Sequence, residues 1–233
     1  MSVWYAIPSA RPGGGALQLW RDRGYWLAVS IDKGHECGIT PNILQTVTPY
    51  PGYATAVNSL VRLILKNDPA AEWIVTGGDD VEPDEWCDPR TIARECTKYF
   101  DGTFGVMQPT GDRWAGGSID RICGSPWMGR EFCERMYGGN GPLWDGWFHC
   151  FVDEELQSVA QGLGVLWQRR DLTHYHRHWA RGNNSREVDF DPRGEPEHLK
   201  DKNVTLDRDR PLFNQRKMEG FPGHEPLARE IYV

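Results

Sequence analysis

The sequence lacks several features that would assign it to a membrane or secreted class. It has no apolar run of about eighteen residues, the length that a membrane-spanning helix needs. Its first residues, Met1-Ser2-Val3-Trp4-Tyr5, do not show the basic start and apolar stretch of a secretory signal. None of the six cysteines form a C-x-x-C pair, which argues against a zinc site and a disulfide framework. Free, buried thiols suit a reducing compartment, so the sequence predicts a cytoplasmic protein.

Two common nucleotide-binding loops are also missing. The glycine run Gly13-Gly14-Gly15 does not have the G-x-G-x-x-G spacing, and no glycine-rich loop carries the P-loop lysine.

The net charge of −7 excludes a protein coated in basic surface, and the negative charge lies in the first 168 residues. The remaining residues are nearly balanced in charge and hold five of the seven histidines. Any contact with a polyanion would therefore be local and C-terminal.

Strand-like and helix-like segments alternate along the chain. Apolar strands are predicted at 3–8, 26–31, 72–76, 104–107 and 164–168. Amphipathic helices are predicted at 16–22, 54–65, 89–99, 126–137 and 152–162. Such alternation predicts the α/β class, with a mostly parallel central sheet flanked by helices. Residues 1–180 are predicted to form one domain, and the polar, charged segment 181–233 is predicted to be an extension that packs on it or extends from it.

The most informative local feature is an apolar strand that ends in two acids. Trp73-Ile74-Val75-Thr76 is followed by Gly77-Gly78-Asp79-Asp80. Open α/β sheets bind ligands at the carboxyl ends of their strands, where carboxylates can hold a divalent cation that neutralises a diphosphate. A solvated turn is an equally good interpretation of these residues taken alone, because Asp and Gly are common in turns.

In its context, this segment resembles the DxD-type motif of GT-A glycosyltransferases, and the order of elements is similar over roughly residues 3 to 180. The resemblance implies a GT-A-like (Rossmann-like) fold, a nucleotide-sugar donor such as a UDP-sugar, and Mn²⁺ or Mg²⁺. It makes Asp80 the metal ligand and Asp79 the donor contact. Gly78 departs from the motif, since many members have their first acid there. The resemblance further places the nucleoside at the ends of the first two strands, near the following residues: Pro8, Ser9, Arg11 and Asp32.

A second acidic segment is predicted at a helix start, in Phe151-Val152-Asp153-Glu154-Glu155-Leu156. Acids in a first helical turn are favoured by the helix dipole, so helix capping is one explanation. By the resemblance, Asp153 is the base that takes the acceptor's proton, and Glu154 is the substitute. Base catalysis by Asp153 would imply that the enzyme inverts the anomeric configuration.

Three histidines occupy alternate positions in Thr173-His174-Tyr175-His176-Arg177-His178-Trp179. On a strand they would share one face, and in a loop they would separate. Many GT-A enzymes add a late histidine to the metal site, which predicts His176, and next His174, as the ligand. A histidine-rich surface loop is the alternative.

The acceptor is predicted less directly. By the resemblance, Trp144, Asp145 and Trp147 shape an acceptor pocket, although both tryptophans suit a core. The short chain also resembles phage-encoded enzymes that glycosylate 5-hydroxymethylpyrimidines in double-stranded DNA, with Arg169 and Arg170 as phosphate contacts. A polysaccharide or glycolipid acceptor is the alternative within the same chemistry. A nucleotidyltransferase and a non-catalytic sugar-nucleotide-binding module are alternatives from other classes.

Overall fold

The computed structural model of the protein describes residues 1–9, 15–32, 38–47, 49–112, 122–177 and 206–228. Strands of the main sheet lie at Ser2–Ser9 (β1), Trp26–Asp32 (β2), Ile43–Val47 (β3), Ala71–Val75 (β4), Val106–Pro109 (β6), Trp127–Gly129 (β7) and Leu166–Arg169 (β8). A second, small sheet pairs Val81–Glu82 (β5) with Tyr175–His176 (β9). The helices are Gly15–Asp22 (α1), Tyr53–Asn67 (α2), Pro89–Phe100 (α3), Arg130–Arg135 (α4), the 3₁₀ turn Met136–Gly139 (η2), Val152–Gly162 (α5) and Leu206–Met218 (α7).

The seven-stranded sheet is mostly parallel. Its strand order is β3-β2-β1-β4-β7-β6-β8, and β7 is antiparallel to both of its neighbours, β4 and β6. The other pairs are parallel. The order places β1 and β4 side by side in the centre of the sheet, so the segments that leave these two strands meet at one edge.

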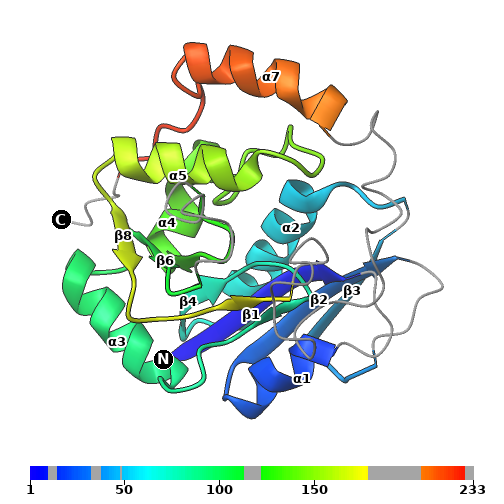
Figure 1. Ribbon diagram of the computed structural model, residues 1–233, viewed down its shortest axis with the longest axis vertical. Coiled ribbons are helices and arrows are strands. Elements are labelled where there is room, and N and C mark those ends of the chain that lie inside the picture. Colours follow the sequence, from blue (N-terminus) through cyan, green and yellow to red (C-terminus); the bar gives the residue numbers. More distant parts are fainter. Residues whose placement is uncertain (10–14, 33–37, 48, 113–121, 178–205, 229–233) are drawn as a thin grey trace.

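Helices cover both faces of the sheet (Figure 1). Alternate residues of β1 point to opposite faces, so Trp4 and Ala6 pack with α2, while Tyr5 and Ile7 pack with α1. Figure 1 shows α2, α4 and α5 on one side, α1 and α3 on the other, and α7 beyond α5. The predicted class is therefore confirmed as an α/β protein with a mostly parallel sheet flanked by helices, which is consistent with a GT-A-like fold.

Most predicted elements are present within a few residues of their expected bounds, but the segment 126–137 differs. Its apolar residues predicted one helix, whereas Trp127–Gly129 forms β7 and only Arg130–Arg135 is helical. The three residues of β7 fill the space between β4 and β6, and their pairing partners are distant in sequence. Long-range pairing of this kind overrides a local helical pattern.

The helix α7 packs on α5 through a buried ion pair. Arg216 donates two hydrogen bonds to the Glu155 carboxylate, from Nε (3.0 Å) and Nη2 (2.7 Å). The same carboxylate accepts hydrogen bonds from the Tyr137 hydroxyl and the Trp147 indole N–H. Four donors thus satisfy a carboxylate that is 1% exposed, as burial of a charge requires.

The same helix also holds the segment that leads into α5. The Asp209 carboxylate, which is fully buried, accepts hydrogen bonds from the backbone N–H groups of His149 and Cys150. Phe213 stacks on Phe151 with ring centroids 4.6 Å apart. Phe151 precedes α5 in a left-handed conformation with φ 67°, so these contacts fix a strained backbone at the start of that helix.

Replacing Arg216 with Met is expected to lower the free energy of unfolding by about 3–5 kcal/mol, because Glu155 would remain buried without its counter-charge. Urea unfolding followed by far-UV circular dichroism measures this difference. Lys217→Met is the matched control, since Lys217 is the next residue on α7 and is exposed. A loss of less than about 1 kcal/mol in Arg216→Met would show that α7 does not stabilise the domain in this way.

Candidate functional site

The candidate site lies where β1 and β4 end. Ser9 is the last residue of β1, and the segment 76–80 follows β4, its neighbour in the sheet. The Ser9 hydroxyl donates a hydrogen bond to Asp79 Oδ2 (2.8 Å). The predicted donor residues Ser9 and Asp79, which are 70 positions apart in sequence, are therefore in direct contact.

Two tyrosines, the buried Tyr5 and the partly buried Tyr53, hold the turn that carries Asp79 and Asp80. The Tyr5 hydroxyl donates to the carbonyl oxygen of Gly78 (2.6 Å), and the Tyr53 hydroxyl donates to that of Gly77 (3.1 Å). Burial raises the pKa of Tyr5, and the nearby carboxylates of Asp79 and Asp80 raise it further. Tyr5 therefore remains a neutral hydrogen-bond donor beneath the two acids.

Asp80 meets His176 across the small sheet. β5 and β9 are antiparallel and pair Val81 with His176, which brings His176 Nε2 to 3.2 Å from Asp80 Oδ1. The backbone N–H of Arg177 also donates to the Asp80 carbonyl oxygen (2.8 Å). The predicted metal ligands Asp80 and His176, distant in sequence, thus present a carboxylate and an imidazole at one place.

Gly78 leaves room for the observed position of the Asp80 carboxylate. A Cβ atom on residue 78 would collide with Asp80 Oδ1, the same oxygen that contacts His176. A side chain at this position would push the Asp80 carboxylate away from the imidazole. The departure from the DxD-type motif at Gly78 is therefore compatible with the Asp80–His176 contact.

His174 lies in the core and not at the strand-end acids. Its Nδ1 is 2.6 Å from the Ser125 hydroxyl, and its Nε2 accepts a hydrogen bond from the Trp127 indole (3.3 Å). Burial lowers the pKa of His174 to about 3, so the ring is neutral at physiological pH. Because both ring nitrogens have protein partners, the arrangement favours His176 over His174 as a ligand. His178 lies outside the described residues.

Tyr53 connects the strand-end acids to the start of α5. Its hydroxyl, which contacts Gly77, also lies 2.9 Å from Thr76 Oγ1. Burial raises the pKa of Tyr53, and the negative charge of Asp153 contributes to this rise. The charge of Asp153, in the first turn of α5, therefore acts on the hydroxyl that holds the end of β4.

Asp153 and Glu154 form an acidic pair in the first turn of α5. Burial, a side-chain hydrogen bond to Asp153 and the charge of Asp153 raise the pKa of Glu154 to about 9. Glu154 is therefore protonated at neutral pH and supplies the proton of that hydrogen bond, with Asp153 as the acceptor. The dipole of α5 stabilises the negative charge on Asp153. Asp153, the predicted base, and Glu154, its predicted substitute, are thus neighbours in one hydrogen-bonded pair, and the choice between them stays a prediction.

The raised pKa of Glu154 has a consequence for stability. Between its ordinary pKa of 4.5 and about 9, the folded protein binds more protons at Glu154 than the unfolded chain does. Stability from this group therefore falls as pH rises through that window. Glu154→Gln, which does not titrate, is expected to become progressively more stable than the natural protein between pH 5.5 and 9.

Urea midpoints measured across this pH range test that expectation. Glu85→Gln, the same change at an exposed position, is the matched control. An equal pH dependence in Glu154→Gln and the natural protein would mean that Glu154 is not protonated in the native state.

A divalent cation would find two protein ligands here, Asp80 and His176. Within the described ranges, no group of three or more His, Cys, Asp or Glu side chains is arranged to hold a metal ion. Two ligands suit a cation that binds together with a diphosphate, because Mg²⁺ typically uses one or two carboxylates, substrate phosphates and water. The residues present therefore fit a nucleotide-dependent metal site better than a permanent one.

The remaining donor residues are only partly described. Pro8 precedes Ser9 at the end of β1, and Asp32 is the last residue of β2, so both are at the predicted edge of the sheet. The side chain of Asp32 lies outside what the structure describes, and so does Arg11.

Of the two tryptophans predicted to shape an acceptor pocket, Trp147 is buried in the core, whereas the acceptor role of the partly buried Trp144 stays a prediction. Trp147 is 1% exposed and donates its indole N–H to Glu155, so it belongs to the core. Trp144 packs against Trp147, and the Arg216 guanidinium lies 3.6 Å from its ring. Asp145 is exposed, and its carbonyl accepts a hydrogen bond from Thr55 (3.4 Å). Both tryptophans thus serve the packing of α7.

The structure also corrects the role predicted for Arg169. Its guanidinium is buried and forms ion pairs with Glu95 and Asp171. A guanidinium engaged by two carboxylates does not contact a DNA phosphate without losing those ion pairs. Arg170, the next residue, is exposed.

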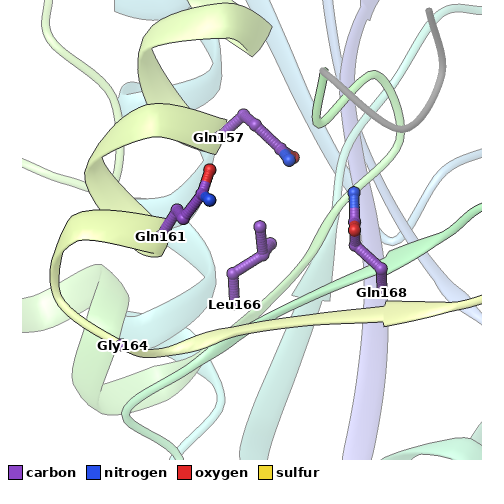
Figure 2. A pocket seen from close by; sticks show the side chains of 5 residues that line it. All are labelled: Gln157, Gln161, Gly164, Leu166 and Gln168. Atoms are coloured by element: carbon purple, nitrogen blue, oxygen red, sulfur yellow. The ribbon is translucent and has the colours of Figure 1, made fainter.

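A pocket of about 290 Å³ lies between α5 and β8. It is lined by the following residues: Gln157, Gln161, Gly164, Leu166 and Gln168. Figure 2 shows the side-chain amides of Gln157 and Gln161 extending from α5, with that of Gln168 rising from β8. Its position did not follow from the sequence, because the three glutamines become neighbours only when β8 packs beside α5.

Comparisons with known proteins give distant structural matches. No protein-family model matches the chain, and no curated protein sequence does. Among solved structures, A197 from STIV is similar with a TM-score of 0.47 and 13% identity, over 76% of this chain and 85% of that chain. A glycosyltransferase involved in the glycosylation of the major capsid of PBCV-1 is similar with a TM-score of 0.34 and 11% identity, over 57% of this chain and 62% of that chain. No helix in the described residues is long and apolar enough to span a membrane.

Proposed function

We propose that this protein is a glycosyltransferase that moves a sugar from a nucleotide-sugar donor, such as a UDP-sugar, to an acceptor hydroxyl. The observation that carries the proposal is the meeting of Ser9 with Asp79 and of Asp80 with His176 at the carboxyl end of the sheet. The Asp153–Glu154 pair lies near the same strand end. The residues proposed to bind the donor and the residue proposed as the base would therefore act at the same edge of the sheet.

In the proposed reaction, Asp79 and the Ser9 hydroxyl bind the nucleoside part of the donor. Asp80 and His176 would hold Mn²⁺ or Mg²⁺, which would supply neutralising positive charge to the departing nucleoside diphosphate. Asp153 accepts the proton of the acceptor hydroxyl, and that oxygen attacks the anomeric carbon with inversion. Glu154, protonated at neutral pH, hydrogen-bonds to Asp153 and holds its carboxylate in place. Hydrogen bonds from the hydroxyls of Tyr5 and Tyr53 hold the turn that carries Asp79 and Asp80.

The reaction class is tested by incubating the full chain with UDP-, dTDP- and GDP-sugars in the presence of Mn²⁺. Release of a nucleoside diphosphate, with a matching mass increase on an acceptor, is the expected result. Release of pyrophosphate would assign nucleotidyl transfer, and donor binding without turnover would assign a non-catalytic binding module.

The nature of the acceptor is a separate part of the proposal. Hydroxymethylpyrimidines in double-stranded DNA and a polysaccharide or glycolipid are the two candidates. The ion pairs of Arg169 remove one of the phosphate contacts that the DNA candidate relied on, whereas the exposed Arg170 keeps a second. Mass spectrometry of nucleosides from hydroxymethylated DNA and of glycan acceptors, both treated with the same donors, separates the two.

A further inference from the structure

We propose that the pocket between α5 and β8 binds a neutral sugar unit of the acceptor. The pocket residues that carry this proposal are Gln157, Gln161 and Gln168, here called the glutamine pocket. The proposal rests on the proposed glycosyltransferase function and assigns its acceptor to carbohydrates.

The chemistry of the lining favours hydroxyl groups. A glutamine amide has two N–H donors and a carbonyl acceptor, so Gln161 and Gln168 can contact a hydroxyl as donor and as acceptor, whereas Gln157, whose carbonyl accepts from Cys123, would contact it as a donor. Three amides surround one hollow in Figure 2, and Leu166 supplies an apolar surface between them. A sugar ring has the same combination of hydroxyl groups and apolar C–H surface.

The described residues that line the pocket carry no charge. None of its lining residues are ionisable, and the acidic pair of Asp153 and Glu154 lies on the same helix. A phosphate would find no cation among these residues and a carboxylate on α5 close by, which disfavours a nucleic-acid backbone. The volume of about 290 Å³ is near the lower end of the roughly 300–1,000 Å³ of small-molecule pockets, which suits one small ring.

Two of the pocket residues lie on the same face of α5 as the proposed base. Asp153, Gln157 and Gln161 are spaced by four residues and form one stripe along α5. Gln157 is one helical turn from Asp153, about 6 Å along the helix axis. A sugar unit held at Gln157 would therefore lie about one helical turn from Asp153.

Cys123 forms hydrogen bonds with both Asp153 and the pocket residue Gln157. Its backbone N–H donates to the carbonyl oxygen of Asp153 (3.2 Å), and its thiol donates to Oε1 of Gln157 (3.1 Å). Burial raises the pKa of the Cys123 thiol, so it stays protonated and can act as this donor. Gln157, which is 6% exposed, is thus positioned by the same residue that contacts the start of α5.

Saturation-transfer NMR with methyl glycosides of glucose, galactose and mannose tests the proposal without any donor present. The natural protein is expected to bind at least one of them saturably at millimolar concentration. Gln161→Met and Gln168→Met each remove one amide at an exposed position and are expected to weaken binding about three- to tenfold, the value of one or two neutral hydrogen bonds. Gln215→Met, on the exposed surface of α7, is the matched control and is expected to bind like the natural protein.

The possible outcomes test sugar binding in the pocket and the proposed function independently. Donor turnover in the natural protein without saturable glycoside binding, or with equal binding by both variants, would overturn the pocket and leave the function standing. Glycoside binding that the two variants weaken, without any donor turnover, would support the pocket and overturn the function. Binding of hydroxymethylated duplex DNA that Gln161→Met and Gln168→Met weaken, while glycosides do not bind, would overturn the carbohydrate assignment.

Discussion

Asp153→Asn is expected to lower the rate of sugar transfer about 10²- to 10⁴-fold, the usual contribution of a general base, while donor affinity stays unchanged. Asn has nearly the same shape as Asp but does not accept a proton at neutral pH. Asp153 lies in the first turn of α5, where the helix dipole favours its negative charge and Glu154 holds the shared proton. Single-turnover kinetics with saturating donor measure the rate, and calorimetry measures donor affinity.

Asp207→Asn is the matched control, because it makes the same change at an exposed acid in the first turn of α7. It is expected to transfer sugar at the natural rate. A natural rate of sugar transfer in Asp153→Asn would show that Asp153 is not the general base. A loss of donor affinity parallel to the loss of rate would instead indicate that Asp153 supports the donor site.

Asp80→Asn is expected to weaken Mn²⁺ binding in the presence of UDP at least about 100-fold. Changing a residue that merely orients a metal ligand already costs 10–100-fold in affinity, and Asp80 is proposed as a direct ligand. The natural protein is expected to bind Mn²⁺ much more tightly with UDP than without it, because the diphosphate would complete a site with two protein ligands. Electron paramagnetic resonance of free Mn²⁺ during titration measures both effects.

Asp22→Asn serves as the control for Asp80→Asn, since Asp22 is an exposed acid at the end of α1. Its Mn²⁺ affinity is expected to equal that of the natural protein. If Asp80→Asn also kept the natural affinity, the Asp80–His176 contact would have only a structural role in joining β5 to β9.

The sequence predicted the parts of the fold that depend on local pattern. The strands that became β1, β2 and β4 and the helices that became α2, α3 and α5 follow from apolar spacing and from the turns between them. β7 was predicted as helix because its apolar residues continue into α4, and its pairing with β4 and β6 is invisible locally. α7 was not predicted as a helix, since its contacts with the domain come from two buried charged residues, Arg216 and Asp209, and from Phe213, which do not form a regular apolar pattern.

The sequence predicted those residues of the candidate site that directly follow a recognisable strand. Asp79 and Asp80 stood out because an apolar strand precedes them, and the parallel order of β1 and β4 explains why Ser9 meets Asp79. The roles of Tyr5 and Tyr53 were not predicted, because buried tyrosines resemble ordinary core residues until their hydroxyl partners are known.

Arg169 shows the opposite error. A pair of adjacent arginines near histidines resembles a phosphate-binding segment, yet Glu95 and Asp171 neutralise the first of the two. Glu95 is 74 positions away in sequence, on α3, so its contact with the end of β8 could not be read from the local pattern. The pattern of charged residues in a sequence does not reveal which basic side chains form ion pairs with acids in the folded protein.

The account depends most directly on a nucleotide and a divalent cation binding together at the ends of β1 and β4. Calorimetric titration of UDP into the full chain, once with Mn²⁺ and once with EDTA, tests this requirement. Saturable binding of one UDP per chain with Mn²⁺, at least about tenfold weaker with EDTA, is the predicted result. Absence of UDP binding under both conditions, or equal affinity in both, would contradict a metal-dependent nucleotide site at Asp80 and His176.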